Sequence, residues 1–297
     1  MTKPFRIFTV CYGNHIDWLN RALVRSLAWP KNKAALQNAK WTIWGDLEDT
    51  QRIYEIATKV LPFHQIELKQ KVLDHGQVDL LACMMQTMKM CLLEKVPMLT
   101  APPDTIFSDG SVDTILEYGQ QEHTCVAVPH PRVLPDIMHD LTEITPSNGE
   151  LVTLALEKYP HQCWVTAQMA LPVSGVNVGG VCWQRLGEKL YAVQHRLPTV
   201  YLSNFTDDDR KFFSKSYKNI AQQYGMWDHE WPGAELMPRE RIRTIGSSDL
   251  AFIVECTEHW KNIPTQRVNN VEERDAFHRD EYHNKIFRQY FNCFRGE

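Results

Sequence analysis

The apolar residues in the first half of the chain follow two alternating patterns. Short, continuous apolar runs predict buried strands at residues 5–11, 41–44, 63–68, 96–101 and 124–128. Between these runs, apolar residues recur at spacings of three and four, which predicts helices at residues 16–27, 53–60, 75–94 and 109–119. Apolar strands that alternate with helices are typical of a parallel sheet covered on both faces.

The second half of the chain is less regular. The same criteria predict helices at residues 133–141, 148–158 and 207–224, and strands at residues 176–183, 241–245 and 250–256. Aromatic residues gather on one side of the segment 272–294, which predicts a C-terminal helix packed across the body of the protein. An arm that binds a partner is the alternative interpretation.

Composition narrows the class of protein. The 297 residues are 43% hydrophobic, which is enough for a large core and too apolar for a disordered chain. The formal net charge of −4 provides no overall attraction to nucleic acids or membrane surfaces. We find no apolar stretch that is long enough for a membrane span and no signal-peptide pattern, so we expect a cytoplasmic protein, or one of the host cytoplasm if it is viral. The eight cysteines form no C-x-x-C pair, which predicts buried free thiols.

Asp104 is the first candidate for chemistry. Ligands of parallel sheets bind beyond the carboxyl ends of the strands, which here means just after Cys11, Trp44 and Ala101. Asp104 follows the strand at 96–101, where a carboxylate can hold a divalent cation against a diphosphate. Asp109 lies close behind it and is better suited to a helix cap.

A second dense cluster is the sequence WDHEWP at residues 227–232. Either carboxylate, Asp228 or Glu230, could act as a general base toward an acceptor hydroxyl. Trp227 and Trp231 could lie against a sugar, although paired tryptophans beside a proline also serve as ordinary core anchors.

The order of these segments resembles that of glycosyltransferases with the GT-A fold. The resemblance covers roughly residues 4–257 and is most specific at PDTIFSDGS (103–111) and in the segment that begins SGVNVGGV (174–181). It implies an α/β, GT-A-like fold, in which helices flank a Rossmann-type, mostly parallel sheet and a helical extension follows at the C-terminus. The domains expected on this basis are a nucleotide-binding half at 1–130, an acceptor- and sugar-binding half of the same domain at 131–258, and a C-terminal helical segment at 259–297.

The resemblance also implies an activity, a cofactor and site residues. The enzyme would transfer a sugar from a nucleotide-sugar donor, with UDP as the favoured nucleotide, to an acceptor hydroxyl, and a divalent cation (Mn²⁺ or Mg²⁺) would assist. Asp104 matches the last aspartate of the family's Asp-x-Asp metal motif, Pro102 replaces the first, and His229 would complete the metal site. The residues that match the nucleotide site are Thr9, Tyr12, Gly13 and Asp46, and those that match the sugar and acceptor pocket are Asn177, Gly179 and Gly180.

The chemistry of the nucleotide-site residues agrees with these roles. Tyr12 could stack on a base, Gly13 permits close approach of a backbone, and Asp46 could accept hydrogen bonds from ribose hydroxyls. A plain strand-to-helix turn explains each of them equally well.

Two basic features bear on the acceptor. Each is either a solvated face or a contact for a phosphate-bearing acceptor, such as a phosphorylated glycan or DNA with a hydroxymethylated base. The first comprises Lys211, Lys215 and Lys218 on one helix face, and the second Arg239, Arg241 and Arg243 on alternate positions of a strand.

Two alternatives to a glycosyltransferase stay open. A nucleotidyltransferase usually carries a glycine-rich, basic loop after its first strand, whereas segment 11–15 has one glycine and no lysine. A non-catalytic module that binds a nucleotide or sugar is the other alternative, because Pro102 departs from the metal motif.

Overall fold

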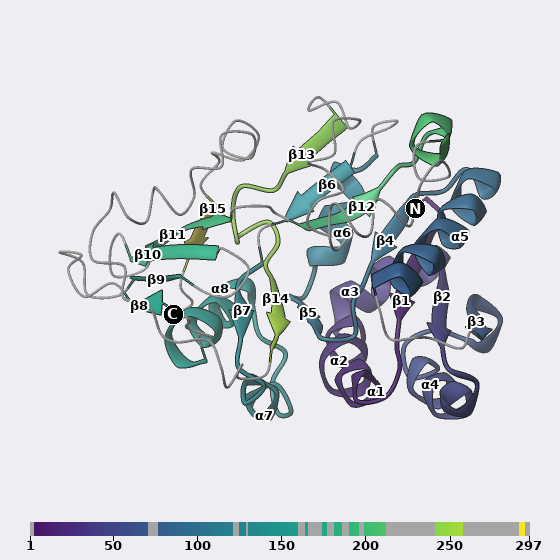
Figure 1. Ribbon diagram of the computed structural model, residues 1–297. Coiled ribbons are helices and arrows are strands. Elements are labelled where there is room, and N and C mark those ends of the chain that lie inside the picture. Colours follow the sequence, from purple (N-terminus) through teal and green to yellow (C-terminus); the bar gives the residue numbers. More distant parts are fainter. Residues whose placement is uncertain are drawn as a thin grey trace.

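A seven-stranded, mostly parallel sheet with helices on both faces forms the body of the protein (Figure 1). The structure is a computed structural model, and it describes residues 3–70, 77–120, 125–128, 130–159, 164–165, 174–176, 181–185, 190–195, 199–211, 241–257 and 291–294. In spatial order the strands are β13 (Ile242–Thr244), β6 (Cys125–Val128), β12 (Thr199–Ser203), β4 (Met98–Thr100), β1 (Phe5–Val10), β2 (Ala39–Gly45) and β3 (Ile66–Gln70). Only β12 runs antiparallel to its neighbours in this sheet.

The sheet spans both halves of the sequence. Strand β12 lies between β4 and β6, and β13 extends the far edge. The protein is therefore a mixed α/β structure whose central sheet draws strands from residues 5 to 244.

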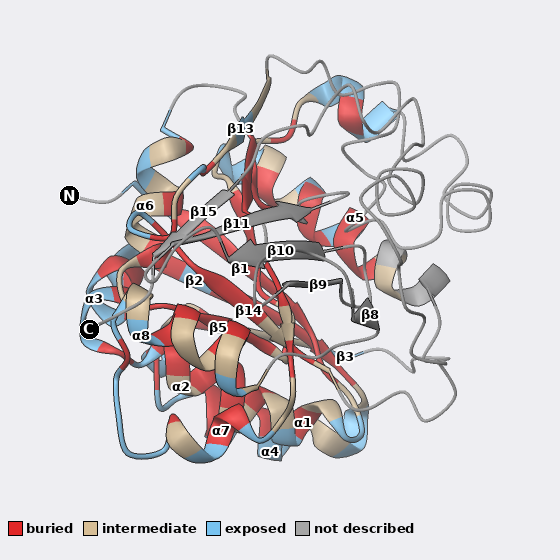
Figure 2. Cartoon of the chain, turned by 90° about the vertical axis from the view of Figure 1, so that its left-hand side faces the viewer, coloured by how far each residue is buried: buried red, intermediate tan, exposed pale blue. Residues whose placement is uncertain are grey.

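Alternate residues of β1 point to opposite faces of the sheet, as the pleat requires. Phe8 and Val10 pack against helix α5 (Gln77–Glu94), in a core layer that contains Met84 and Met88. Phe5 and Ile7 belong to the core layer on the other face. Figure 2 shows the resulting pattern, with buried strands in the centre and helices that are buried only on their inner sides.

The second face is covered mainly by the chain segment that follows β1. This segment comprises α1 (His15–Trp18), a π-helical stretch η1 (Leu19–Leu23) and α2 (Val24–Leu27). Helices α3 (Pro30–Ala35), α4 (Thr50–Ala57) and α6 (Ser111–Tyr118) lie beside it, and short 3-10 turns at Leu36–Asn38, Leu47–Asp49 and Phe63–Gln65 connect the elements.

Two smaller sheets complete the fold. One consists of β5 (Thr105–Phe107), β14 (Ile253–Cys256) and β7 (Arg132–Val133). The other is antiparallel, in the order β15 (Phe291–Phe294), β11 (Leu190–His195), β10 (Val181–Arg185), β9 (Ser174–Val176) and β8 (Trp164–Val165). Helices α7 (Ile137–Asp140) and α8 (Asn148–Thr153) precede this sheet, and a π-helical stretch (Leu154–Lys158) continues α8.

Two side chains, the half-buried Asp109 and the buried Asn32, cap the starts of helices α3 and α6. Asp109 accepts hydrogen bonds from the backbone N–H groups of Lys31 (2.8 Å) and Asn32 (3.1 Å) at the start of α3. The side-chain oxygen of Asn32, which is fully buried, accepts from the N–H groups of Gly110 (2.9 Å) and Val112 (3.2 Å) at the start of α6. Gly110 has φ of +101°, a conformation that favours glycine. Asp109 is thus a helix cap, as predicted, although it caps α3 rather than the helix that follows it.

A buried ion-pair network ties β1 to the elements around it. The Arg6 guanidinium is fully buried and donates to Thr42 (2.6 Å), Glu67 (2.7 Å) and Glu94 (2.6 Å). Lys40 also donates to Glu94 at 3.2 Å. The network joins three neighbouring strands to the end of α5.

Several predicted elements are wrong in extent. In place of the single strand expected at 176–183, β9 (Ser174–Val176) and β10 (Val181–Arg185) are two strands that pair antiparallel. Phe291–Phe294, expected as the end of a helix, pairs with β11 as a strand, and the rest of that expected helix lies outside the described residues. The helix expected at 133–141 is shorter, because Val133 ends β7 and α7 starts only at Ile137.

The described cysteines agree with the prediction of free thiols. Five of them, Cys11, Cys83, Cys91, Cys125 and Cys256, are unbonded and buried. In the part of the chain that the structure describes, we find no helix with the length and apolar character needed to cross a membrane.

Candidate functional site

The central sheet has a topological switch point at β1. The chain passes from β1 to β2 and β3 on one side, whereas β4 lies on the other side of β1. In open parallel sheets, the crevice beyond the carboxyl ends of the strands at such a point is the usual place for a ligand. Three turns meet there, which follow β1, β2 and β4 and contain Tyr12, Asp46 and Asp104.

The turn after β1 is tight and borders open space. Gly13 has φ of +52°, and a Cβ atom placed on it would meet no described heavy atom within 4 Å. Its N–H donates to Asp49 Oδ2 at 3.3 Å, which links this turn to the one after β2. The rings of Tyr12 and His15 lie 4.9 Å apart at a tilt of 46°. An aromatic face and a side-chain-free backbone therefore flank the same opening.

The turn after β2 adds negative charge beside Tyr12. Burial raises the pKa of the Tyr12 phenol, and the negative charge of Asp46 raises it further. The backbone oxygen of Asp46 accepts from the N–H of Asp49 (3.2 Å) and the hydroxyl of Thr50 (3.3 Å), which fixes the turn at the start of α4. Asp46 therefore lies within electrostatic reach of the Tyr12 hydroxyl.

The turn after β4 presents Asp104. Thr105 N donates to Pro102 O at 3.1 Å, so residues 102–105 form a β-turn with proline at its second position, a place that suits its fixed φ. The backbone oxygen of Asp104 accepts from Cys256 N at 2.8 Å. This turn carries the partly buried Asp104 from the central sheet into strand β5 of the small three-stranded sheet.

Charged residues at this edge shift the pKa values of two buried thiols, Cys11 and Cys256. Burial raises the pKa of Cys11 well above its usual range, and the negative charges of Asp49 and Asp104 raise it further, whereas Arg52 lowers it. Burial also raises the pKa of Cys256, again with a contribution from Asp104. Asp49, Arg52 and Asp104, which come from two different turns and from the start of α4, therefore converge on one edge.

Thr9 lies inside the protein rather than at the opening. Its side chain is buried, its hydroxyl donates to Ala101 O at 2.8 Å, and it accepts from Trp41 Nε1 at 2.9 Å. These bonds hold β1 against its two neighbours. The Thr9 hydroxyl thus uses its one hydrogen inside the protein and has no further hydrogen to donate to a nucleotide.

The structure brings together four of the residues that the sequence nominated, Tyr12, Gly13, Asp46 and Asp104, at one sheet edge. Thr9 lies in the interior, and the remaining nominated residues lie outside the described ranges: Asn177, Gly179, Gly180, Trp227, Asp228, His229, Glu230 and Trp231. Within the described ranges, we find no group of three or more histidine, cysteine, aspartate or glutamate side chains placed to hold a metal ion.

Three residues at this edge were not identified from the sequence. Asp49 and Arg52 follow Asp46 in the segment DLEDTQR, at the start of α4. His15 starts α1 immediately after the turn that holds Tyr12. Their position within eight residues of a predicted strand end is the signal that could have included them.

A second polar cluster lies beside Asp104 on the small sheet. Glu255 is paired with Thr105 in register and binds His130 Nε2 at 3.0 Å and Arg132 at 3.1 Å. His130 is buried and lies edge-on to Tyr201, with ring centroids 5.8 Å apart. These contacts anchor the strand that receives the Asp104 turn.

Two of the basic residues predicted for the acceptor, Arg241 and Lys211, are engaged within the protein, whereas Arg243 is exposed on β13. Arg241 forms a two-pronged ion pair with the buried Asp209 (3.0 and 2.9 Å) and donates to Asn204 O at 3.0 Å. Lys211 pairs with Asp208 at 2.8 Å. Lys215, Lys218 and Arg239 lie outside the described residues.

No family model matches the sequence, and no curated protein matches it. Among solved structures, one similar in outline is the crystal structure of GalNAc-T7 with UDP, GalNAc and Mn²⁺, with a TM-score of 0.40 and 10% identity. The match covers 96% of this chain and 50% of that one, so the chain spans about half the length of that structure. At this TM-score we base no conclusion about fold or activity on the likeness.

Proposed function

We propose that this protein is a glycosyltransferase that takes its sugar from a nucleotide-sugar donor, with UDP as the favoured nucleotide. The observation that supports the proposal is the convergence of Tyr12, Gly13, Asp46 and Asp104 at the switch point of a mostly parallel sheet. The sequence resemblance to GT-A glycosyltransferases, argued from the segments at 103–111 and 174–181, adds to it.

In this proposal the described edge binds the nucleotide part of the donor. The Tyr12 ring stacks on the base, the Asp46 carboxylate accepts hydrogen bonds from the ribose, and the backbone at Gly13 lets the donor approach closely. Arg52 supplies positive charge near the diphosphate, beside the carboxylates of Asp49 and Asp104.

The carboxylate of Asp104 fits a hard divalent cation such as Mg²⁺ or Mn²⁺. It is partly exposed at the edge, and these ions need only a few protein oxygens because water and phosphate complete their shell. When bound, the cation would supply positive charge that stabilises the departing diphosphate. We propose His229 as its second protein ligand.

The acceptor side of the proposal rests on residues outside the described ranges. Asn177, Gly179 and Gly180 would line the sugar pocket, and Asp228 or Glu230 would take the proton from the acceptor hydroxyl. The acceptor hydroxyl would belong to a glycan or to a hydroxymethylated DNA base.

The first test is a thermal-unfolding panel of UDP-, GDP-, CMP- and TDP-sugars, each with Mn²⁺, Mg²⁺ or EDTA. A donor at a hundredfold excess over its Kd stabilises the native state by about 2.7 kcal/mol, which raises the melting temperature by about 5 °C for a chain of this size. A rise with one UDP-sugar that EDTA abolishes supports the proposal together with its metal. The absence of a rise with any donor contradicts it.

Variants connect the result to the described edge. Asp104→Asn should abolish the metal-dependent part of the stabilisation, and Tyr12→Ala should weaken donor binding about tenfold, with Tyr12→Phe close to wild type. Glu117→Gln, an equal change of charge at an exposed position on α6, is the control and should leave donor binding unchanged. Release of free nucleotide diphosphate distinguishes an enzyme from a binding module, because the module would bind the donor without turnover.

A further inference from the structure

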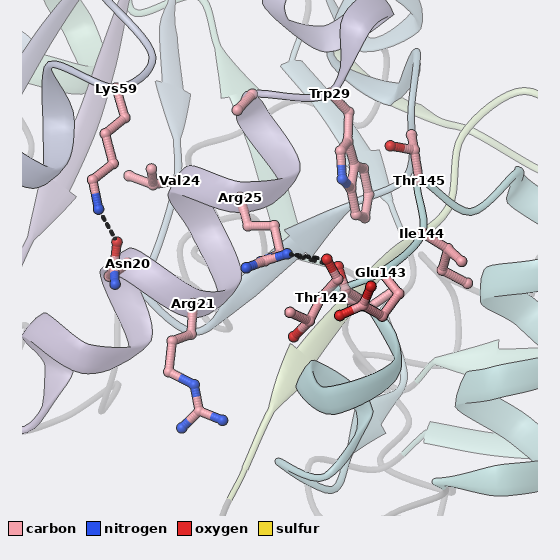
Figure 3. Close-up of a pocket in the computed structure, with 12 residues that line it drawn as sticks. Asn20, Arg21, Val24, Arg25, Trp29, Lys59, Thr142, Glu143, Ile144 and Thr145 are labelled. Atoms are coloured by element: carbon pink, nitrogen blue, oxygen red, sulfur yellow. Dashed lines mark hydrogen bonds between the residues drawn. The ribbon is translucent and has the colours of Figure 1, made fainter.

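A pocket separate from the switch point opens beside the helical segment that follows β1. It is lined by that segment, by Lys59 and by the loop at 141–145, and its volume is about 470 Å³ (Figure 3). This volume is within the range of small-molecule sites. The pocket shares none of its lining residues with the edge at Tyr12, Asp46 and Asp104.

The residues that line the pocket carry a positive excess, although Asp17 outside the lining pairs with one of them, Arg21, at 3.2 Å. The charged lining residues are Arg21, Arg25 and Lys59, which are positive, and Glu143, which is negative, an excess of two positive charges. A phosphate monoester carries about two negative charges at neutral pH. The charge of the pocket therefore matches a phosphate group better than it matches a single carboxylate.

The two arginines belong to the same pocket lining but point in different directions: Arg25 reaches the loop at 141–145, whereas Arg21 forms an exposed ion pair with Asp17 at 3.2 Å, which an incoming anion can replace (Figure 3). They are four residues apart on the same helical segment, where two like charges repel each other. Arg25 donates from one nitrogen to the backbone oxygens of Leu141 and Thr142, both at 3.0 Å, which holds the fork at the pocket wall. Among the described residues, the Nε and second Nη atoms of Arg25 have no hydrogen-bond acceptor, so their N–H groups are available to an anion.

The backbone of the helix is irregular at this pocket. Residues Leu19–Leu23 form a π-helical stretch, which contains the pocket residues Asn20 and Arg21. Such stretches are rare and often mark functional sites, because the wider turn changes the direction of the side chains. Lys59 reaches the same stretch and donates to Asn20 Oδ1 at 2.8 Å, as Figure 3 shows.

The remaining walls suit a ligand larger than phosphate. Val24, Trp29 and Ile144 supply apolar surface, whereas Asn20, Thr142 and Glu143 supply groups that can bond hydroxyls. Apolar patches interspersed with hydroxyl-binding groups match a sugar, which has C–H faces and hydroxyl edges.

We propose that this pocket binds a phosphorylated sugar, with the phosphate held by Arg25 and by Arg21, the latter released from Asp17, and the sugar against the loop at 141–145. Binding requires neither the nucleotide-sugar donor nor a metal. A negative result for phosphorylated-sugar binding would therefore not contradict the proposed transferase function. A negative result for the transferase would likewise not contradict this site.

The test is calorimetric titration of the full chain with glucose 6-phosphate, glucose and inorganic phosphate at low ionic strength. We expect saturable binding of glucose 6-phosphate that is at least about tenfold tighter than that of glucose or phosphate, because loss of either part removes charge-assisted or hydroxyl contacts. Arg21→Gln should weaken binding about tenfold or more. Its ion pair with Asp17 is exposed and contributes little to stability, so the variant should fold like wild type. Lys59→Gln should also weaken binding.

Lys33→Gln is the matched control, because Lys33 is exposed on α3 and does not line the pocket. It should leave the affinity unchanged, and thermal unfolding of each variant verifies that it is folded. The proposal is overturned if glucose 6-phosphate does not bind saturably, if inorganic phosphate binds as tightly, or if Arg21→Gln binds like wild type or no more weakly than the Lys33 variant.

Discussion

Asn32 offers a direct test of how the helices around the site are held. Its fully buried side chain accepts from two N–H groups at the start of α6 and donates to the carbonyls of Ser26 (3.0 Å), Phe107 (3.3 Å) and Ser108 (3.0 Å). Replacement by alanine removes all five bonds and leaves their buried partners in place.

The expected cost follows from these bonds. Loss of a helix cap costs about 1 kcal/mol, and each buried group that is left without a partner costs about 1–3 kcal/mol, reduced where the chain can relax. We expect Asn32→Ala to lower the free energy of unfolding by about 4 kcal/mol, a large share of the roughly 5–15 kcal/mol of a typical domain.

Equilibrium urea unfolding, followed by tryptophan fluorescence and circular dichroism, measures this loss. The control is Gln37→Ala, which removes an exposed amide at the end of the same helical region and should change stability by less than about 0.5 kcal/mol. A cost below about 1 kcal/mol for Asn32→Ala, at an unchanged urea slope, would refute the view that this amide fastens α3 to α6.

Three further predictions concern buried or paired groups. Burial would raise the pKa of Glu94, but the hydrogen bonds from Arg6 and Lys40 outweigh burial and lower this pKa. The Glu94 carboxylate therefore stabilises the fold at a pH above its ordinary pKa of 4.5, and this contribution is lost as the pH falls below that value. Urea titrations from pH 7 to 3 should therefore show a shallower acid destabilisation in Glu94→Gln, and an unchanged slope would contradict this. Because burial raises its pKa, Cys11 should react with iodoacetamide at pH 8 only after unfolding, as mass spectrometry of native and denatured samples would detect. Asp209→Asn should lower the free energy of unfolding in urea by about 3 kcal/mol, because it leaves Arg241 without its buried counter-charge. A loss below about 1 kcal/mol would argue against a structural ion pair.

The sequence alone predicts those parts of the fold that depend on neighbours along the chain. Strands β1 and β2 and helix α5 have apolar patterns that their own residues specify, and their predicted positions agree with the structure to within a few residues. The capping box of Ser147 and Glu150 likewise starts α8 at the predicted residue. The site edge was predicted for the same reason, since strand ends can be located from the strands themselves.

Other features depend on residues that are far apart in the sequence. The pairing of Asn32 with the 107–112 segment joins positions nearly 80 residues apart, and no local pattern indicates it. The place of strand β12 between β4 and β6 is likewise a matter of tertiary pairing, which no local pattern indicates. The cationic pocket was missed because Arg21 and Arg25 are an ordinary solvated helix face until the loop at 141–145 packs beside them.

The position of β12 also sets an order of events during synthesis. Strands β4 and β6 are both made long before residue 199, yet they do not pair with each other, because β12 separates them. While the chain emerges from the ribosome, the facing edges of these two strands therefore keep unpaired backbone groups until Thr199–Ser203 arrives and inserts between them. The first 130 residues should consequently be a poor unit for separate expression, and the nascent chain should depend on chaperones that shield strand edges until the gap is filled.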